Sequence, residues 1–83
     1  MKKILYFSGE WCGPCKNFKP IMESISQTIP VTFIDIDTRP DLVSQYGIRS
    51  VPTLVFIDGN GMEVNKKVGV LSENQVRDTY NQL

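Results

Sequence analysis

The chain has 83 residues, of which nine are basic and nine acidic, so its formal net charge is zero. These charges are spread along the sequence, which gives no basic face for nucleic acid or an anionic membrane. The apolar stretch after Met1-Lys2-Lys3 has four residues, whereas a secretion signal needs about 7–15, so we expect no leader, no membrane segment and a cytoplasmic location.

The first part of the chain predicts a strand, a helix and a second strand. Residues 3–8 form a short apolar run that ends at Ser8-Gly9, which indicates a buried strand. From Pro14 to about Thr28 apolar residues recur at helical spacing, and residues 31–36 are again rich in β-formers. This close succession indicates a parallel βαβ unit.

A short helix is predicted next, over residues 40–46. Asp37 or Thr38 is expected to cap its first turn, because both side chains accept hydrogen bonds from free backbone N–H groups. Gly47 is expected to end the helix, because glycine readily takes the left-handed backbone found after helix C-termini.

The remaining chain predicts a hairpin and a last helix. Residues 53–57 and 62–68 are its β-rich arms, and Asp58-Gly59-Asn60-Gly61 between them is a strong turn signal. Ser72-Glu73-Asn74-Gln75 has the form of a capping box, which starts the final helix. The order β-α-β-α-β-β-α predicts an α/β fold in a single domain over 1–83, with a central four-stranded mixed sheet flanked by three helices.

The only two cysteines, Cys12 and Cys15, fall where the first strand leads into the first helix. Disulfide exchange needs a thiolate, and a helix N-terminus stabilises negative charge. We therefore expect Cys12 to be the nucleophile and Cys15 the resolving thiol. A zinc site takes about four ligands, whereas the chain offers two cysteines and no histidine. A disulfide between Cys12 and Cys15 would close a very small ring and would therefore add little stability. Redox chemistry is favoured over both alternatives.

The segment Trp11-Cys12-Gly13-Pro14-Cys15-Lys16 resembles the active-site motif of the thioredoxin family. Pro20 stands where the family has a proline in its helix, residues 46–54 resemble a second signature, and residues 68–72 resemble a last one. The resemblance covers nearly the whole chain. It implies a thioredoxin-like fold that lacks the usual N-terminal strand and helix, close in size to glutaredoxins and to short thioredoxin-like proteins.

The resemblance also implies a binding site and an activity. Val51-Pro52 is expected to be a cis peptide bond that faces the cysteines and presents its backbone to a substrate strand. The groove around Cys12 is expected to be lined by Trp11, Gly13, Pro14, Val51, Pro52, Gly69 and Val70. The implied function is a thiol-disulfide oxidoreductase that reduces protein disulfides, an electron carrier of cell redox homeostasis. It would bind no cofactor or metal, work as a monomer, and be reduced by thioredoxin reductase with NADPH.

Two alternative functions are also compatible with the sequence. A glutaredoxin-like protein reduced by glutathione is favoured by the short length and disfavoured by the Gly-Pro spacer, with Lys16 and Arg49 as weak candidates for a glutathione clamp. A non-catalytic binding subunit would use the same groove without turnover. The direction of electron flow depends on the potential of the cysteine pair.

The chain departs from the family at Tyr6, where thioredoxins bury an aspartate that assists proton transfer at the second cysteine, and at Phe33, where they have a nearby lysine. The joint loss is coherent, because one buried charge left alone costs about 3–5 kcal/mol. Two hypotheses follow for the deprotonation of Cys15. Tyr6 relays a proton or holds a water through its hydroxyl, or Asp35, on the strand face of Phe33, partly replaces the missing carboxylate.

Overall fold

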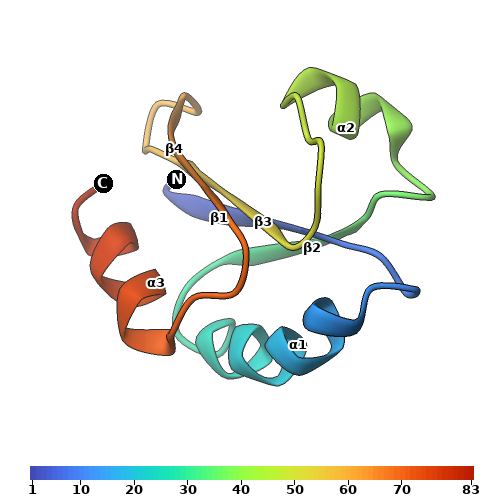
Figure 1. Cartoon of the computed structure of the whole chain (residues 1–83). Coiled ribbons are helices and arrows are strands. Elements are labelled where there is room, and N and C mark those ends of the chain that lie inside the picture. Colours follow the sequence, from blue (N-terminus) through green and yellow to red (C-terminus); the bar gives the residue numbers. More distant parts are fainter.

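The computed structural model describes residues 1–83 and has the predicted order of elements (Figure 1). One mixed sheet, in the order β2-β1-β3-β4, contains β1 (Lys3–Ser8), β2 (Val31–Asp35), β3 (Thr53–Ile57) and β4 (Glu63–Val68). Only β1 and β2 are parallel neighbours. Helices α1 (Gly13–Ile25) and α3 (Glu73–Asn81) lie on one face and α2 (Pro40–Gln45) on the other. The predicted fold is confirmed, and no helix has the length and apolar character needed to cross a bilayer.

The central strands β1 and β3 are apolar at successive positions because both faces of the sheet are covered there. Alternate side chains of these strands, among them Tyr6 and Phe56, join α1 and α3 in the larger core cluster. The others, among them Phe7 and Val55, join residues around α2 in a smaller cluster. Tyr6 thus ties β1 to α1 close to the junction that carries the cysteines.

Helix α1 begins at the cysteine motif. Cys12 is its N-cap, with an extended backbone, and the Cys12 sulfur accepts the N–H of Cys15 at 3.1 Å. Pro14 lies in the first turn, where its missing N–H removes no helical hydrogen bond. Pro20 lies inside the helix, which continues to Ile25.

The predicted N-cap of α2 is wrong. Arg39 takes that position and makes no side-chain cap, with Pro40 directly after it. Asp37 is unavailable because a carboxylate oxygen accepts the indole N–H of Trp11, at 3.0 Å. The Thr38 hydroxyl donates to the Asp35 carbonyl, at 3.2 Å. Both side chains therefore make hydrogen bonds outside α2, and the N-terminus of this helix has no side-chain cap.

The C-terminus of α2 is as predicted. Gly47 has a φ of 63°, and its N–H donates to the Ser44 carbonyl, while the N–H of Ile48 donates to the Val43 carbonyl at 2.9 Å. This pair of bonds is a Schellman motif. Lys66 on β4 adds an ammonium that donates to the carbonyl of Tyr46, the C-cap residue. The chain therefore leaves α2 in a fixed direction, toward Val51-Pro52.

The predicted capping box of α3 is present. The Ser72 hydroxyl accepts the N–H of Gln75 at 3.1 Å, and the Gln75 side chain accepts the N–H of Ser72 at 2.9 Å. Ser72→Ala removes the first of these bonds and is expected to lower the free energy of unfolding by about 1 kcal/mol, measured by urea denaturation. Ser24→Ala, at an exposed position inside α1, is the matched control and is expected to change stability by less than about 0.5 kcal/mol. Equal losses in both variants would contradict the capping role.

Candidate active site at the start of helix α1

The two cysteines form a disulfide, with their Cα atoms 5.3 Å apart. Cys12 is 5% exposed and Cys15 is 3% exposed. The N–H of Cys15 points at the Cys12 sulfur, and the free N–H groups of the first helical turn surround the same end of α1. A thiolate formed at Cys12 on reduction is stabilised there by a charge-assisted hydrogen bond and by the helix dipole.

A second segment of chain lies directly against Cys12. The Cys12 sulfur is 3.8 Å from the Val51 carbonyl oxygen, and Val51-Pro52 is a cis peptide bond, as expected. The N–H of Gly69 donates to the Pro52 carbonyl at 2.9 Å, so the end of β4 is joined to the start of β3 beside the cysteines. The structure therefore brings together five of the predicted site residues: Cys12, Cys15, Val51, Pro52 and Gly69.

The remaining predicted groove residues, Gly13, Pro14, Val70 and Trp11, are exposed. Gly13 and Pro14 follow Cys12 directly, and Val70 follows Gly69. Their contact with a substrate stays a prediction.

Gly69 has a φ of +98°, a conformation that other residues adopt only with strain. Gly69→Ala is expected to lower the free energy of unfolding by about 1–3 kcal/mol, measured by urea denaturation. Gly59→Ala is the matched control, because Gly59 lies outside the left-handed region and a Cβ there meets nothing within 4 Å. A Gly69→Ala variant as stable as this control would show that the backbone at Gly69 relaxes freely.

Trp11 is 65% exposed, yet its ring is held in place. Its indole N–H donates to Asp37, and the ring lies so close to Gly9 that a Cβ on Gly9 would come within 2.9 Å of it. The Asp35 carboxylate accepts the N–H of Asp37 at 2.9 Å, which orders the turn after β2. Asp37 was missed as a site residue in the sequence. Its position just after β2 could have identified it, because β2 and the parallel strand β1, which leads to the cysteines, end at the same edge of the sheet.

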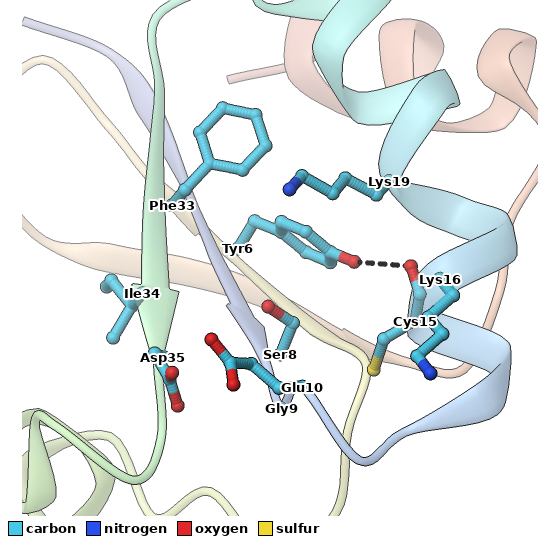
Figure 2. Close-up of a pocket in the computed structure, with 10 residues that line it drawn as sticks. All are labelled: Tyr6, Ser8, Gly9, Glu10, Cys15, Lys16, Lys19, Phe33, Ile34 and Asp35. Atoms are coloured by element: carbon cyan, nitrogen blue, oxygen red, sulfur yellow. Dashed lines mark hydrogen bonds between the residues drawn. The ribbon is translucent and has the colours of Figure 1, made fainter.

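A pocket of about 410 Å³ opens beside Cys15, between β1, β2 and α1 (Figure 2). Its lining consists of Tyr6, Ser8, Gly9, Glu10, Cys15, Lys16, Lys19, Phe33, Ile34 and Asp35. Asp35 and Phe33 both face it, as the strand alternation predicted. No group of three or more His, Cys, Asp or Glu side chains is placed to hold a metal ion.

Tyr6 occupies the inner side of this pocket. Its hydroxyl donates to the Cys15 carbonyl at 3.2 Å, and its ring meets Phe18 and Phe33 edge to face, at 5.7 and 5.6 Å between centroids. Burial raises the pKa of Tyr6 above that of an ordinary tyrosine, opposed in part by a hydrogen bond with Ser8. At neutral pH the hydroxyl is therefore a protonated donor. A proton relay through Tyr6 stays a prediction.

The comparisons with known proteins agree on one family. The family model for thioredoxin matches residues 1–82. The chain is 39% identical over 82 residues to thioredoxin from Rickettsia felis, covering 94% of this chain and 77% of that protein. It is 34% identical over 76 residues to thioredoxin from Chlamydia trachomatis, covering 88% and 74%.

Solved structures give the same result. A mutant thioredoxin from Halobacterium salinarum superposes with a TM-score of 0.91 at 34% identity, covering 98% of this chain and 73% of that one. Thioredoxin from Fasciola hepatica superposes with a TM-score of 0.88 at 28% identity, covering 98% and 79%. The chain belongs to the thioredoxin family, and its paired Cys12 and Cys15 make it a thiol-disulfide oxidoreductase.

Proposed function

We propose that the protein reduces disulfide bonds of other proteins, with Cys12 attacking first and Cys15 second. The Cys12 thiolate attacks a substrate disulfide, one substrate sulfur leaves as a thiolate, and a mixed disulfide forms. Cys15 then attacks Cys12, which closes the Cys12–Cys15 bond and releases the second substrate thiolate. The observation that carries this order is the place of Cys12 at the N-cap, where the N–H of Cys15 supports a thiolate.

The substrate strand is proposed to lie in the groove beside Cys12. Contacts are expected from Trp11, Gly13, Pro14, Val51, Pro52, Gly69 and Val70. Support comes from the short distance between the Cys12 sulfur and the Val51 carbonyl, and from the hydrogen bond that joins Gly69 to Pro52. Exposed Trp11 and Val70 add apolar area at the rim, at 65% and 50% exposure.

The electron donor is proposed to be thioredoxin reductase with NADPH, and the protein to be a monomeric electron carrier of the cytoplasm. Residues 1–83 would act as a single domain that binds no cofactor. The Gly13-Pro14 spacer and the named relatives support this donor, since those relatives are thioredoxins. Glutathione is the competing donor, and a binding subunit without turnover the competing role.

The experiment is a redox titration of the cysteine pair together with insulin reduction under either donor. The potential is expected near the value of about −270 mV of thioredoxin, and far from the value of about −120 mV of a strong oxidant. Turnover is expected with NADPH and thioredoxin reductase. Faster turnover with glutathione would assign the glutaredoxin-like role. A potential near that of the oxidant would overturn the reductive direction.

A further inference from the structure

Cys15 has to lose its thiol proton before it attacks the mixed disulfide, because the thiolate is the nucleophile. Cys15 is only 3% exposed, and solvent reaches this residue through the pocket beside it. At about 410 Å³ this pocket has room for several waters, each of which takes about 30 Å³ in the liquid. The pocket is therefore a path by which solvent water can reach the Cys15 thiol.

The lining of the pocket narrows the choice of proton acceptor. The Tyr6 hydroxyl already donates a hydrogen bond to the Cys15 carbonyl, and the Ser8 hydroxyl is neutral, so neither group is a base. Lys16 and Lys19 line the pocket from α1 with ammonium groups, and Figure 2 shows Lys19 extending toward Tyr6 and Phe33. The two remaining polar side chains are carboxylates, Glu10 on the loop after β1 and Asp35 at the end of β2.

The two carboxylates differ in the hydrogen bonds that they already make within the protein. The Asp35 carboxylate accepts the N–H of Asp37, and Asp37 in turn anchors Trp11. The Glu10 carboxylate makes no hydrogen bond within the protein and belongs to none of its three ion pairs. Glu10 lines the pocket, and Figure 2 shows its carboxylate between Ser8 and Asp35. Glu10 is thus the carboxylate that is free to accept a proton from pocket water.

We propose that Glu10 accepts the Cys15 proton through water in the pocket, with Lys16 and Lys19 stabilising the resulting thiolate. The inference rests on the proposed order of attack. The proton passes from the Cys15 sulfur to water and on to Glu10, and the thiolate attacks the Cys12 sulfur. The Cys12–Cys15 bond forms as the bond from Cys12 to the substrate breaks. The substrate sulfur leaves with the electron pair, so the substrate is reduced and the cysteine pair oxidised.

The test is stopped-flow reaction of the reduced protein with dithiobis(nitrobenzoate). Attack by Cys12 releases one thionitrobenzoate, and attack by Cys15 on the resulting mixed disulfide releases a second. The mixed disulfide is formed at acid pH and then jumped to a series of higher pH values. Glu10→Gln is expected to slow the second release about tenfold at neutral pH, which is less than the usual general-base effect of about 10²–10⁴-fold because solvent water still assists. The two rates are expected to converge at alkaline pH, where hydroxide removes the proton.

Glu23→Gln is the matched control, because Glu23 is exposed on α1 and does not line the pocket, so both releases should keep their rates. Asp35→Asn and Tyr6→Phe test the two other groups in the same assay. An unchanged second release in Glu10→Gln would overturn the proposal, as would equal slowing at every pH, which marks a structural role. A pH-selective loss in Asp35→Asn alone would move the acceptor to Asp35 and also overturn it. A first release that persists in Cys12→Ser and disappears in Cys15→Ser would instead refute the order of attack.

Discussion

Replacing Cys12 with serine is expected to lower insulin reduction to the uncatalysed background, because no other thiol in the chain can attack a substrate disulfide from the N-cap of α1. Cys15→Ser is expected to abolish turnover as well, but with a different end state. Cys12 still attacks, and the mixed disulfide persists because nothing resolves it. Insulin turbidity measures the loss, and non-reducing electrophoresis with mass spectrometry shows the trapped adduct.

The pair of variants separates the competing functions. An adduct in Cys15→Ser and none in Cys12→Ser would establish the order of attack. The reverse result would make Cys15 the nucleophile and would contradict the proposal that the N-terminus of α1 activates Cys12. Full partner function in Cys12→Ser would favour a binding subunit, because such a role depends on the groove and not on the thiol.

The fold was predictable because its signals are local. The capping residues Ser72 and Gln75 and the helix-ending Gly47 act within one turn of chain, so the sequence shows their role directly. The cap of α2 failed for the opposite reason. Asp37 has the chemistry of a cap, but its carboxylate binds Trp11, 26 residues away in the chain. Such competition between local and distant partners becomes visible only in three dimensions.

The parts of the site differ in what was needed to predict them. Cys12 and Cys15 follow from helix chemistry alone, whereas the cis bond at Val51-Pro52 needed the family resemblance, since a proline by itself is cis in only about 5–6% of cases. The pocket beside Cys15 depends on how β1, β2 and α1 pack, so Glu10 gave no signal in the sequence. The strand alternation did place Asp35 and Phe33 on one face.

Tyr6 and Phe33 stand where the family resemblance implies a buried charge pair, and here they form an aromatic contact instead. Tyr6 is 1% exposed and Phe33 is 43% exposed, and their rings meet edge to face. Edge-to-face pairs of this kind contribute about 0.5–1.5 kcal/mol beyond their buried area. The ring of Tyr6 is therefore packed against apolar side chains, whereas its hydroxyl lies at the pocket, hydrogen-bonded to the Cys15 carbonyl and close to Ser8. A carboxylate at this position would have no ammonium group from residue 33, and the Lys16 and Lys19 ammonium groups that line the same pocket are exposed to solvent.

Tyr6→Asp is accordingly expected to lower the free energy of unfolding by about 3–5 kcal/mol at neutral pH, the cost of a buried charge without its partner. That is a large part of the roughly 4–12 kcal/mol expected for 83 residues. Burial raises the pKa of the introduced carboxyl above its unfolded value of about 3.9, so the penalty is full above the folded pKa and fades as the pH falls toward the unfolded one. Tyr6→Asn, similar in size but uncharged, is the matched control. Urea denaturation should show the two variants apart at neutral pH and together at acid pH, and Phe33→Lys added to Tyr6→Asp should recover part of the loss. Equal stability of the two single variants at neutral pH would mean that the pocket hydrates the introduced charge, and that the paired loss of the family's two charges has another cause.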